Sequence, residues 1–192
     1  MSTHALPEKV RKGDPKRDRG NRTGFSTGAN SAAAAAAATL GLVHGQVPDF
    51  IDCVLPNTQR VRFAITGGWT DGRRARAVSI KDAGDDPDAT NGAHLTAEVE
   101  RLPGAAGRIE LRGGPGVGVV TKPGLGLEVG GPAINPVPRR NIHANVEAAG
   151  QPILEAGDGI AVTLSVPGGD EMAKKTLNAR LGILGGISIL GT

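Results

Sequence analysis

Four aspartates stand within seven positions of a glycine-punctuated segment, residues 81–92, and a lysine precedes them. These residues are Lys81, Asp82, Asp85, Asp86 and Asp88. Clustered carboxylates repel one another, so the segment needs water, cationic partners or a ligand that donates hydrogen bonds. A carboxylate there is suited to accept a proton or to face a positive charge. The alternative is a solvated turn, because Asp, Gly, Pro and Asn are the ordinary turn residues.

A second candidate site lies where hydroxyl side chains precede a run of seven alanines. The run predicts a helix, with Ser26, Thr27 or Asn30 as its N-cap and Gly41 at its C-terminal end. A helix start presents free N–H groups and the positive end of a dipole. With Arg22 beside it, this helix start could bind a carboxylate or a phosphate. The alternative is that the hydroxyls only cap the helix.

Two further segments carry cations. Arg139 and Arg140 follow a proline-stiffened stretch and begin a predicted helix that runs to Ala149 and ends at Gly150. Paired arginines at a helix start oppose its dipole, which favours a role as anion binders or as partners of the aspartate loop.

Residues 113–124 are rich in glycine and end in a threonine, a lysine and a proline. They match neither the phosphate-binding loop nor the dinucleotide fingerprint, because Lys122 follows Thr121 and precedes a proline, and because the third glycine of the fingerprint is absent. What remains is a backbone able to approach a ligand closely, with one hydroxyl and one ammonium group beside it.

Alternating segments predict the elements that hold these residues. Residues 75–80 and 95–100 read as strands on either side of the aspartate loop. Residues 51–55 and 60–65 predict a β-hairpin with its turn at 56–59, and residues 67–72 predict a loop. Further strands are expected at 108–112 and 159–167.

Composition bounds the class of protein. The chain has 192 residues, few aromatic side chains and one cysteine, Cys53, so an intramolecular disulfide is excluded. Residues 1–22 carry seven basic and three acidic side chains, a net charge of +4, whereas the whole chain is +3. The remainder is therefore near −1, which argues against a nucleic-acid-binding domain. Residues 1–21 are expected to form a disordered basic tail. Without a signal peptide or a long apolar span, a cytoplasmic location and no membrane association are expected.

Several long stretches together resemble one family. They are residues 22–28 with the alanine run, 80–88 with Thr90 and Gly92, 116–125, 133–139 and 178–192. The chain resembles the CbiD family, the cobalt-precorrin-5B C1-methyltransferases of oxygen-independent cobalamin biosynthesis. The family commonly has a cysteine where this chain has Asn30, so no role of that thiol is carried over.

The resemblance implies an α+β fold for residues 22–192, a two-layer sandwich in which a few helices pack on a mixed or antiparallel sheet. It also implies a second, Rossmann-like domain beyond this chain. The reaction implied is methyl transfer from S-adenosylmethionine to C1 of cobalt-precorrin-5B, with cobalt only as part of the substrate and no metal site in the protein. The sequence leaves assembly into a homo-oligomer open.

The resemblance also assigns roles to the candidate residues. One of Asp82, Asp85, Asp86 and Asp88 would remove a proton or face the sulfonium. The many carboxylate arms of the tetrapyrrole would be bound by cations, hydroxyls and amides. These are Arg22, Thr23, Ser26, Thr27, Lys81, Thr121, Lys122, Asn135, Arg139 and Arg140. Gly116 and Gly118 would approach the methyl donor.

Two other classes of function compete with this one. The first is a module that binds a divalent metal or a phosphate through the aspartates and Lys122, although their spacing does not match the calcium-binding loop. The second is a non-catalytic interaction domain, in which the glycine-rich loops only shape the fold.

Overall fold

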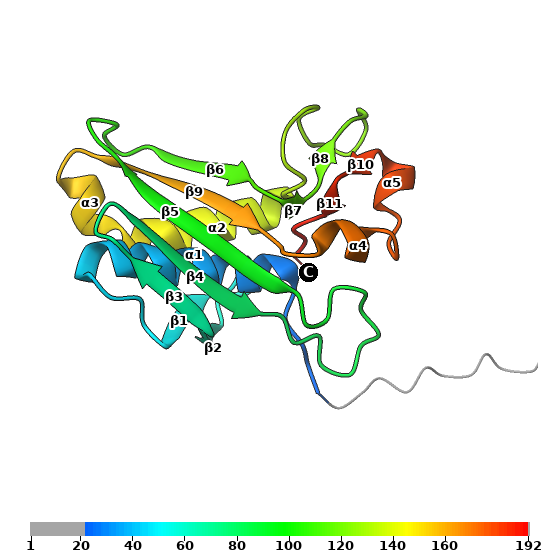
Figure 1. Ribbon diagram of the computed structural model, residues 1–192, viewed down its shortest axis with the longest axis horizontal. Helices are drawn as coiled ribbons and strands as arrows, with labels where there is room; N and C mark the ends of the chain where they lie inside the picture. Colours follow the sequence, from blue (N-terminus) through cyan, green and yellow to red (C-terminus); the bar gives the residue numbers. More distant parts are fainter. Residues whose placement is uncertain (1–21, 192) are drawn as a thin grey trace, which may run out of the picture.

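A five-stranded mixed sheet forms one layer of the computed structural model, which describes residues 22–191 (Figure 1). Its strand order is β3-β4-β5-β9-β6. The strands are β3 (Gly67–Thr70), β4 (Arg74–Ile80), β5 (His94–Leu102), β9 (Gly159–Ser165) and β6 (Ile109–Gly113). All neighbours are antiparallel except β6 and β9, which are parallel. The prediction of an α+β fold with a mixed sheet is confirmed, and the aspartate loop joins β4 to β5.

Strand β3 was not expected, because residues 67–72 read as a loop. Glycine is depleted in strands, so Gly67 and Gly68 hid the element from the sequence pattern. The backbone pairs with β4, with Gly68 opposite Ala77. A Cβ atom on Gly68 would lie 2.5 Å from Cγ1 of Val47, so glycine is needed there for close packing.

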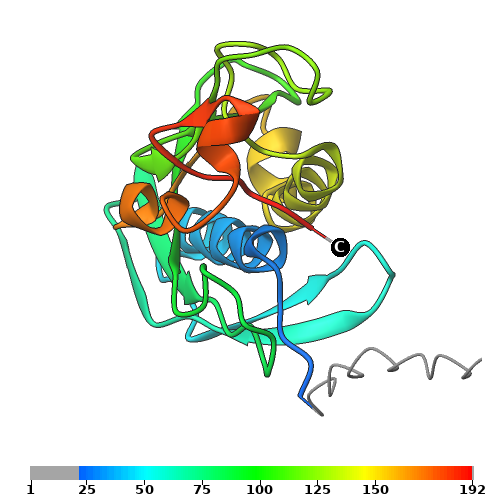
Figure 2. The same ribbon diagram turned by 90° about the vertical axis from the view of Figure 1, so that its right-hand side faces the viewer.

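The alanine run forms α1 (Thr27–His44), which is buried along most of its length between the sheet, α2 and strand β1 (Figure 2). Small side chains allow these neighbours to approach the helix on several sides. Ser26 is the N-cap, and it was one of the three residues predicted for that position. The helix does not end at Gly41, which lies inside it and packs against Val47. It ends at His44, and the left-handed backbone of Gly45 forms the C-cap.

Helix α2 (Pro136–Ala149) begins three residues before the predicted start. Proline lacks an N–H group and has a fixed φ, so Pro136 suits the first position of the helix. Arg139 and Arg140 therefore stand one turn into α2 and do not open it. Gly150 follows the last residue, as predicted, and the short α3 (Gln151–Glu155) comes next.

The predicted hairpin is confirmed as a separate two-stranded sheet, β1 (Phe50–Val54) and β2 (Arg60–Ala64). The remaining short elements lie together at one end of the molecule (Figure 1). They are β7 (Gly116–Val117), β8 (Val119–Val120), α4 (Gly169–Ala173), α5 (Asn178–Leu181), β10 (Ile183–Leu184) and β11 (Gly186–Ile187). Strand β8 pairs with β10, and β7 pairs with β11.

Within residues 22–191, no helix has both the length and the apolar character needed to cross a bilayer. The predicted basic tail at 1–21 lies outside the described residues.

Candidate functional site

Four segments that are distant in sequence meet at the N-terminal end of α1 (Figure 2). They are the entering segment 22–26, the aspartate loop, the closing segment 188–191 and the start of α2. The N–H of Phe25 donates to the carbonyl of Asp82 at 2.8 Å, and the N–H of Gly28 donates to the carbonyl of Leu190 at 2.7 Å. The N–H of Asn135 donates to the carbonyl of Ile189 at 3.0 Å. Most residues predicted as functional therefore surround one helix start.

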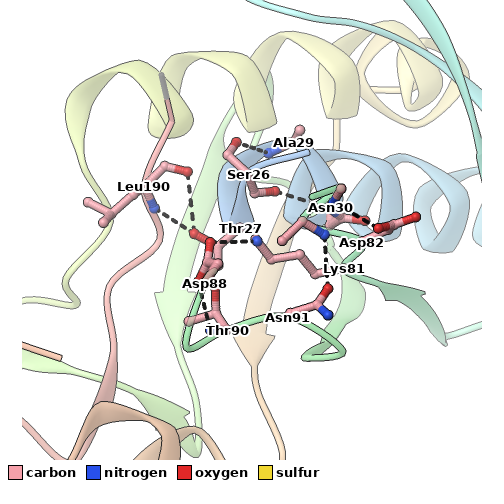
Figure 3. Close-up of polar contacts among 12 residues, drawn as sticks. Ser26, Thr27, Ala29, Asn30, Lys81, Asp82, Asp88, Thr90, Asn91 and Leu190 are labelled. Atoms are coloured by element: carbon pink, nitrogen blue, oxygen red, sulfur yellow. Dashed lines mark hydrogen bonds and ion pairs between the residues drawn. The ribbon is translucent and has the colours of Figure 1, made fainter. Parts of the chain in front are cut away.

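The helix start is capped by the protein itself (Figure 3). Ser26 Oγ accepts from the N–H of Ala29 at 3.1 Å, and Thr27 Oγ1 accepts from the N–H of Leu190 at 2.8 Å. The N–H of Gly28 is already bonded to Leu190. These contacts support the capping alternative for Ser26, because two donors of the first helical turn are engaged within the chain. The Thr27 hydroxyl instead holds the closing segment against the helix start.

The entering segment ties down one side of the aspartate loop. Nη2 of Arg22 pairs with Oδ1 of Asp82 at 2.8 Å, and the backbone N–H of Arg22 donates to Oδ2 of Asp85 at 2.9 Å. Thr23 and Gly84 form an antiparallel bridge. Gly84 has φ +67°, and a Cβ atom there would lie 2.2 Å from the carbonyl oxygen of Arg22, so only glycine fits this crossing.

The other side of the loop is held by the buried side chain of Lys81. This side chain is only 3 % exposed, and its Nζ lies 2.8 Å from Oδ2 of Asp88 (Figure 3). The other carboxylate oxygen of Asp88 accepts from the backbone N–H and the hydroxyl of Thr90, both at 2.7 Å. A buried ammonium group is costly unless it is paired, so Asp88 is its necessary counter-ion.

The four aspartates are therefore not equivalent. Asp82 and Asp85 accept hydrogen bonds from Arg22 that tie the loop to the entering segment. Asp88 accepts hydrogen bonds from Lys81 and Thr90 within the loop itself. Asp86 is exposed and has no hydrogen bond or ion pair with any residue in the range 22–191. The sequence left the four undivided, and these contacts distinguish Asp86 from the others.

Asp88→Asn is expected to lower the free energy of unfolding by about 2 kcal/mol, because it leaves the buried Lys81 ammonium without an anion. The effect stays below that of a fully buried pair, since the side chain of Asp88 is 39 % exposed. The double variant Lys81→Met/Asp88→Asn should lose less than the sum of the two single losses, by at least about 1 kcal/mol. Urea unfolding of the three variants measures this coupling, and strictly additive losses would contradict it.

The pairing of Lys81 with Asp88 also predicts how the stability of the fold depends on pH. Burial by itself raises the pKa of the Asp88 carboxyl, but hydrogen bonds from Lys81 and Thr90 outweigh it, so the pKa lies below its ordinary value. The resulting stabilisation is fully present above the unfolded-state pKa of about 4 and is lost as pH falls through the folded-state pKa. Asp88→Asn should therefore lose stability less steeply than the natural chain below about pH 4. Identical slopes would show that these bonds do not lower the pKa of Asp88.

Another group of predicted residues lies away from the start of α1, around β7 and β8. Thr121 Oγ1 donates to the carbonyl of Gly182 at 2.8 Å, and exposed Lys122 rests its aliphatic carbons against Gly182. Cβ atoms on Gly116 and Gly118 would lie 1.9 Å from the carbonyl oxygen of Val166 and 2.3 Å from Cγ2 of Ile183. The close approach that these glycines permit is thus to the protein itself.

Arg139 and Arg140 are exposed on α2, and within residues 22–191 neither forms an ion pair. The alternative that they pair with the aspartate loop is therefore corrected, because Arg22 and Lys81 occupy that position.

Two hollows lie beside α2. The smaller, of about 160 Å³, is lined by Thr23, Ser26, Asn57, Pro138, Asn141 and Gly191, among others. The larger, of about 630 Å³, is lined by Val54, Leu55, Val137, Arg140, Asn141 and Ala144, among others. Of the predicted site residues, Thr23, Ser26 and Arg140 line these hollows. The four aspartates, Lys122 and Arg139 do not.

Asn30 is a structural residue whose contacts are not evident from the sequence. It is buried in α1, its Nδ2 donates to the carbonyl of Ser26 at 3.0 Å, and its Oδ1 accepts from the Ser79 hydroxyl at 2.9 Å. It thereby links the helix start to β4, immediately before the aspartate loop. A polar amide within a run of small helix formers was the signal that could have indicated this role.

The described part of the chain holds no group of three His, Cys, Asp or Glu side chains placed to bind a metal ion. Asp82, Asp85 and Asp88 accept hydrogen bonds from Arg22, Lys81 and backbone N–H groups, and these contacts disfavour the alternative in which the aspartates bind a metal ion. Cys53 is buried, and burial raises the pKa of its thiol to about 12. The burial of Cys53 disfavours a reactive thiol.

Comparison with known proteins identifies relatives across almost the whole chain. A protein of Dechloromonas aromatica named cobalt-precorrin-5B C(1)-methyltransferase is 69 % identical over 98 % of this chain and 48 % of its own length. A Thermus thermophilus protein of the same name is 52 % identical over 93 % of this chain and 46 % of its own. The chain thus spans about half the length of the curated relatives it matches.

Comparison with solved structures also identifies a similar protein. The crystal structure of the cobalamin biosynthesis protein cbiD from Archaeoglobus fulgidus is similar with a TM-score of 0.64 and 31 % identity, over 89 % of this chain and 52 % of that one. The CbiD family model matches residues 14–192, which include every element described above. The chain therefore belongs to the CbiD family.

Proposed function

We propose that this chain forms the first half of an enzyme that methylates C1 of cobalt-precorrin-5B, giving cobalt-precorrin-6A, with S-adenosylmethionine as the methyl donor. The observation that carries the proposal is the 69 % identity to a cobalt-precorrin-5B C(1)-methyltransferase over 98 % of this chain. The half of that relative which this chain does not match would be a second, Rossmann-like domain.

The substrate is a tetrapyrrole with many carboxylate arms, and such a polyanion needs several separate cations. Lys122, Arg139 and Arg140 are exposed and form no ion pair within residues 22–191, so they are suited to bind carboxylates. Arg22 is also exposed but already faces Asp82. Lys81 is buried against Asp88, so we assign it the task of holding the loop and not direct contact with the substrate.

S-adenosylmethionine carries an electrophilic methyl group, so the protein's main task is to align the two reactants. Gly116 and Gly118 pack against Val166 and Ile183, which leaves no open cradle at these glycines for the donor. We therefore assign most contacts with the donor to the half that this chain does not cover. This chain would contribute the cations that bind the substrate. It would also contribute the exposed carboxylate of Asp86.

A fusion protein tests this proposal. Residues 1–192 are fused to the remaining half of the Dechloromonas aromatica relative, and the product is mixed with cobalt-precorrin-5B and S-adenosylmethionine. Transfer of a labelled methyl group to C1, detected by mass spectrometry and NMR, is the expected result. The natural relative is the positive control. A folded fusion that binds neither reactant, while the relative methylates under the same conditions, would overturn the proposal.

A further inference from the structure

The larger hollow is a groove between the β1–β2 hairpin and helix α2. Its hairpin wall is formed by Val54, Leu55 and Pro56. Its helix wall is formed by Val137, Arg140, Asn141, Ala144, Asn145 and Ala148. Most of these side chains are apolar or small, and none belongs to the aspartate loop. The groove is therefore distinct from the acidic site at the start of α1.

The groove exposes apolar side chains that a folded protein normally buries. Val54 is 44 % exposed and Val137 is 37 % exposed, and Phe50, on the same hairpin, is 61 % exposed. On α2, Val137, Ala144 and Ala148 recur at intervals of seven and four residues, so they share one helix face. A contiguous apolar surface rimmed by polar groups is typical of an interaction site.

The groove is already formed before anything binds to it. Asn145 on α2 accepts from the N–H of Val54 at 3.1 Å and donates through Nδ2 to the carbonyl of Val54 at 3.0 Å. This double contact holds the hairpin edge to the helix and satisfies backbone groups that would otherwise need a partner. Binding therefore requires little reordering of the groove walls.

The position of the closing segment indicates what covers the groove. Gly191 lines the smaller hollow and lies close to the start of α2. A Cβ atom on Gly191 would lie 3.3 Å from Cγ and Cδ of Pro138 and 3.8 Å from Cγ1 of Val137. The smaller hollow shares Leu55, Pro56 and Asn141 with the groove. The last described residue, Gly191, thus lies beside the groove, and this chain covers only 48 % of the length of the Dechloromonas aromatica relative.

We propose that this groove docks the half of the CbiD-family protein that this chain does not cover. The contact would be made by apolar side chains of that half seated against Val54, Val137 and Ala144. This inference rests on the placement of the chain as the first half in the proposed function. It does not depend on the reaction.

Thiol labelling tests the inference without an activity assay. Ala144→Cys places a thiol in the groove, and Ala179→Cys places one on exposed helix α5, outside the groove, as the matched control. The natural Cys53 is buried and its thiol pKa is raised to about 12, so it reacts slowly. Labelling is followed by peptide mass spectrometry, in residues 1–192 alone and in the fusion with the remaining half of the Dechloromonas aromatica relative.

In residues 1–192 alone, the two introduced thiols should react at similar rates. In the fusion, the Ala144→Cys thiol should react at least about tenfold more slowly, because labelling then requires the two halves to separate. The Ala179→Cys thiol should keep its rate. Equal rates for Ala144→Cys in the two proteins would overturn the inference, as would equal protection of both positions.

A second copy of this chain is the competing occupant. If it covered the groove, Ala144→Cys would be protected in residues 1–192 alone and would become reactive on dilution, which would also overturn the inference. Because labelling needs no substrate, a fusion that is inactive but protected at Ala144→Cys would contradict the proposed reaction and support the docking surface.

Discussion

Gly116→Ala is expected to lower the free energy of unfolding by about 4 kcal/mol or more, which is exceptional for a single substitution. Gly116 has φ +78°, a conformation that side chains rarely adopt, and its Cβ atom would lie 1.9 Å from the carbonyl oxygen of Val166. The obstruction is backbone, which cannot rotate away as a side chain can. Urea unfolding followed by circular dichroism measures the loss.

Gly104→Ala is the matched control for this substitution. Gly104 has a similar φ of +70°, but a Cβ atom there would have no neighbour within 4 Å. Only the conformational strain remains, so the expected loss is about 1–2 kcal/mol. If Gly116→Ala were no worse than this control, close packing would not explain the glycine, and its assignment to the methyl donor would regain support.

Asp86→Asn in the fusion with the remaining half of the relative is expected to reduce kcat/KM for methylation by about 100-fold or more, the usual effect of removing a carboxylate that transfers a proton. The unfolding free energy should stay unchanged, because Asp86 makes no hydrogen bond or ion pair with residues 22–191. Steady-state methyl transfer and urea unfolding measured on the same preparation separate the two effects.

Asp49→Asn is the control for Asp86→Asn, since Asp49 is an exposed aspartate outside the loop and precedes β1. It should leave both turnover and stability unchanged. Natural turnover in Asp86→Asn would remove this carboxylate from the chemistry. A parallel fall in stability would instead assign it the same loop-holding role as Asp88.

The sequence identified the elements whose signals are local. Alternation along residues 75–80 and 95–100 predicted the strands on either side of the aspartate loop, and the alanine run predicted the central helix, because both patterns are read within one element. The sequence predicted element ends less well. Gly41 reads as a helix stop but is a packing glycine, and Pro136 reads as a preceding linker but is the first residue of α2.

The candidate site, too, could be predicted from the sequence only in part. The residues that could do chemistry were visible in the sequence, and the family resemblance that grouped them is confirmed for residues 14–192. Their partners were not visible. Asp85 is bound by Arg22, 63 positions earlier, and Thr27 is bound by Leu190, 163 positions later. No periodicity or spacing rule links positions so far apart.

By itself, then, the sequence determined the central helix, the strands with clear alternation, the family and the set of residues able to do chemistry, because residue type and local spacing carry that information. The tertiary structure alone decided which carboxylates hold the loop and which one has no partner within residues 22–191. It also decided that Gly116 and Gly118 make room for the protein's own atoms, and that an apolar groove lies beside the closing segment. The physical reason is that hydrogen bonding, burial and steric exclusion depend on which distant segments meet in space.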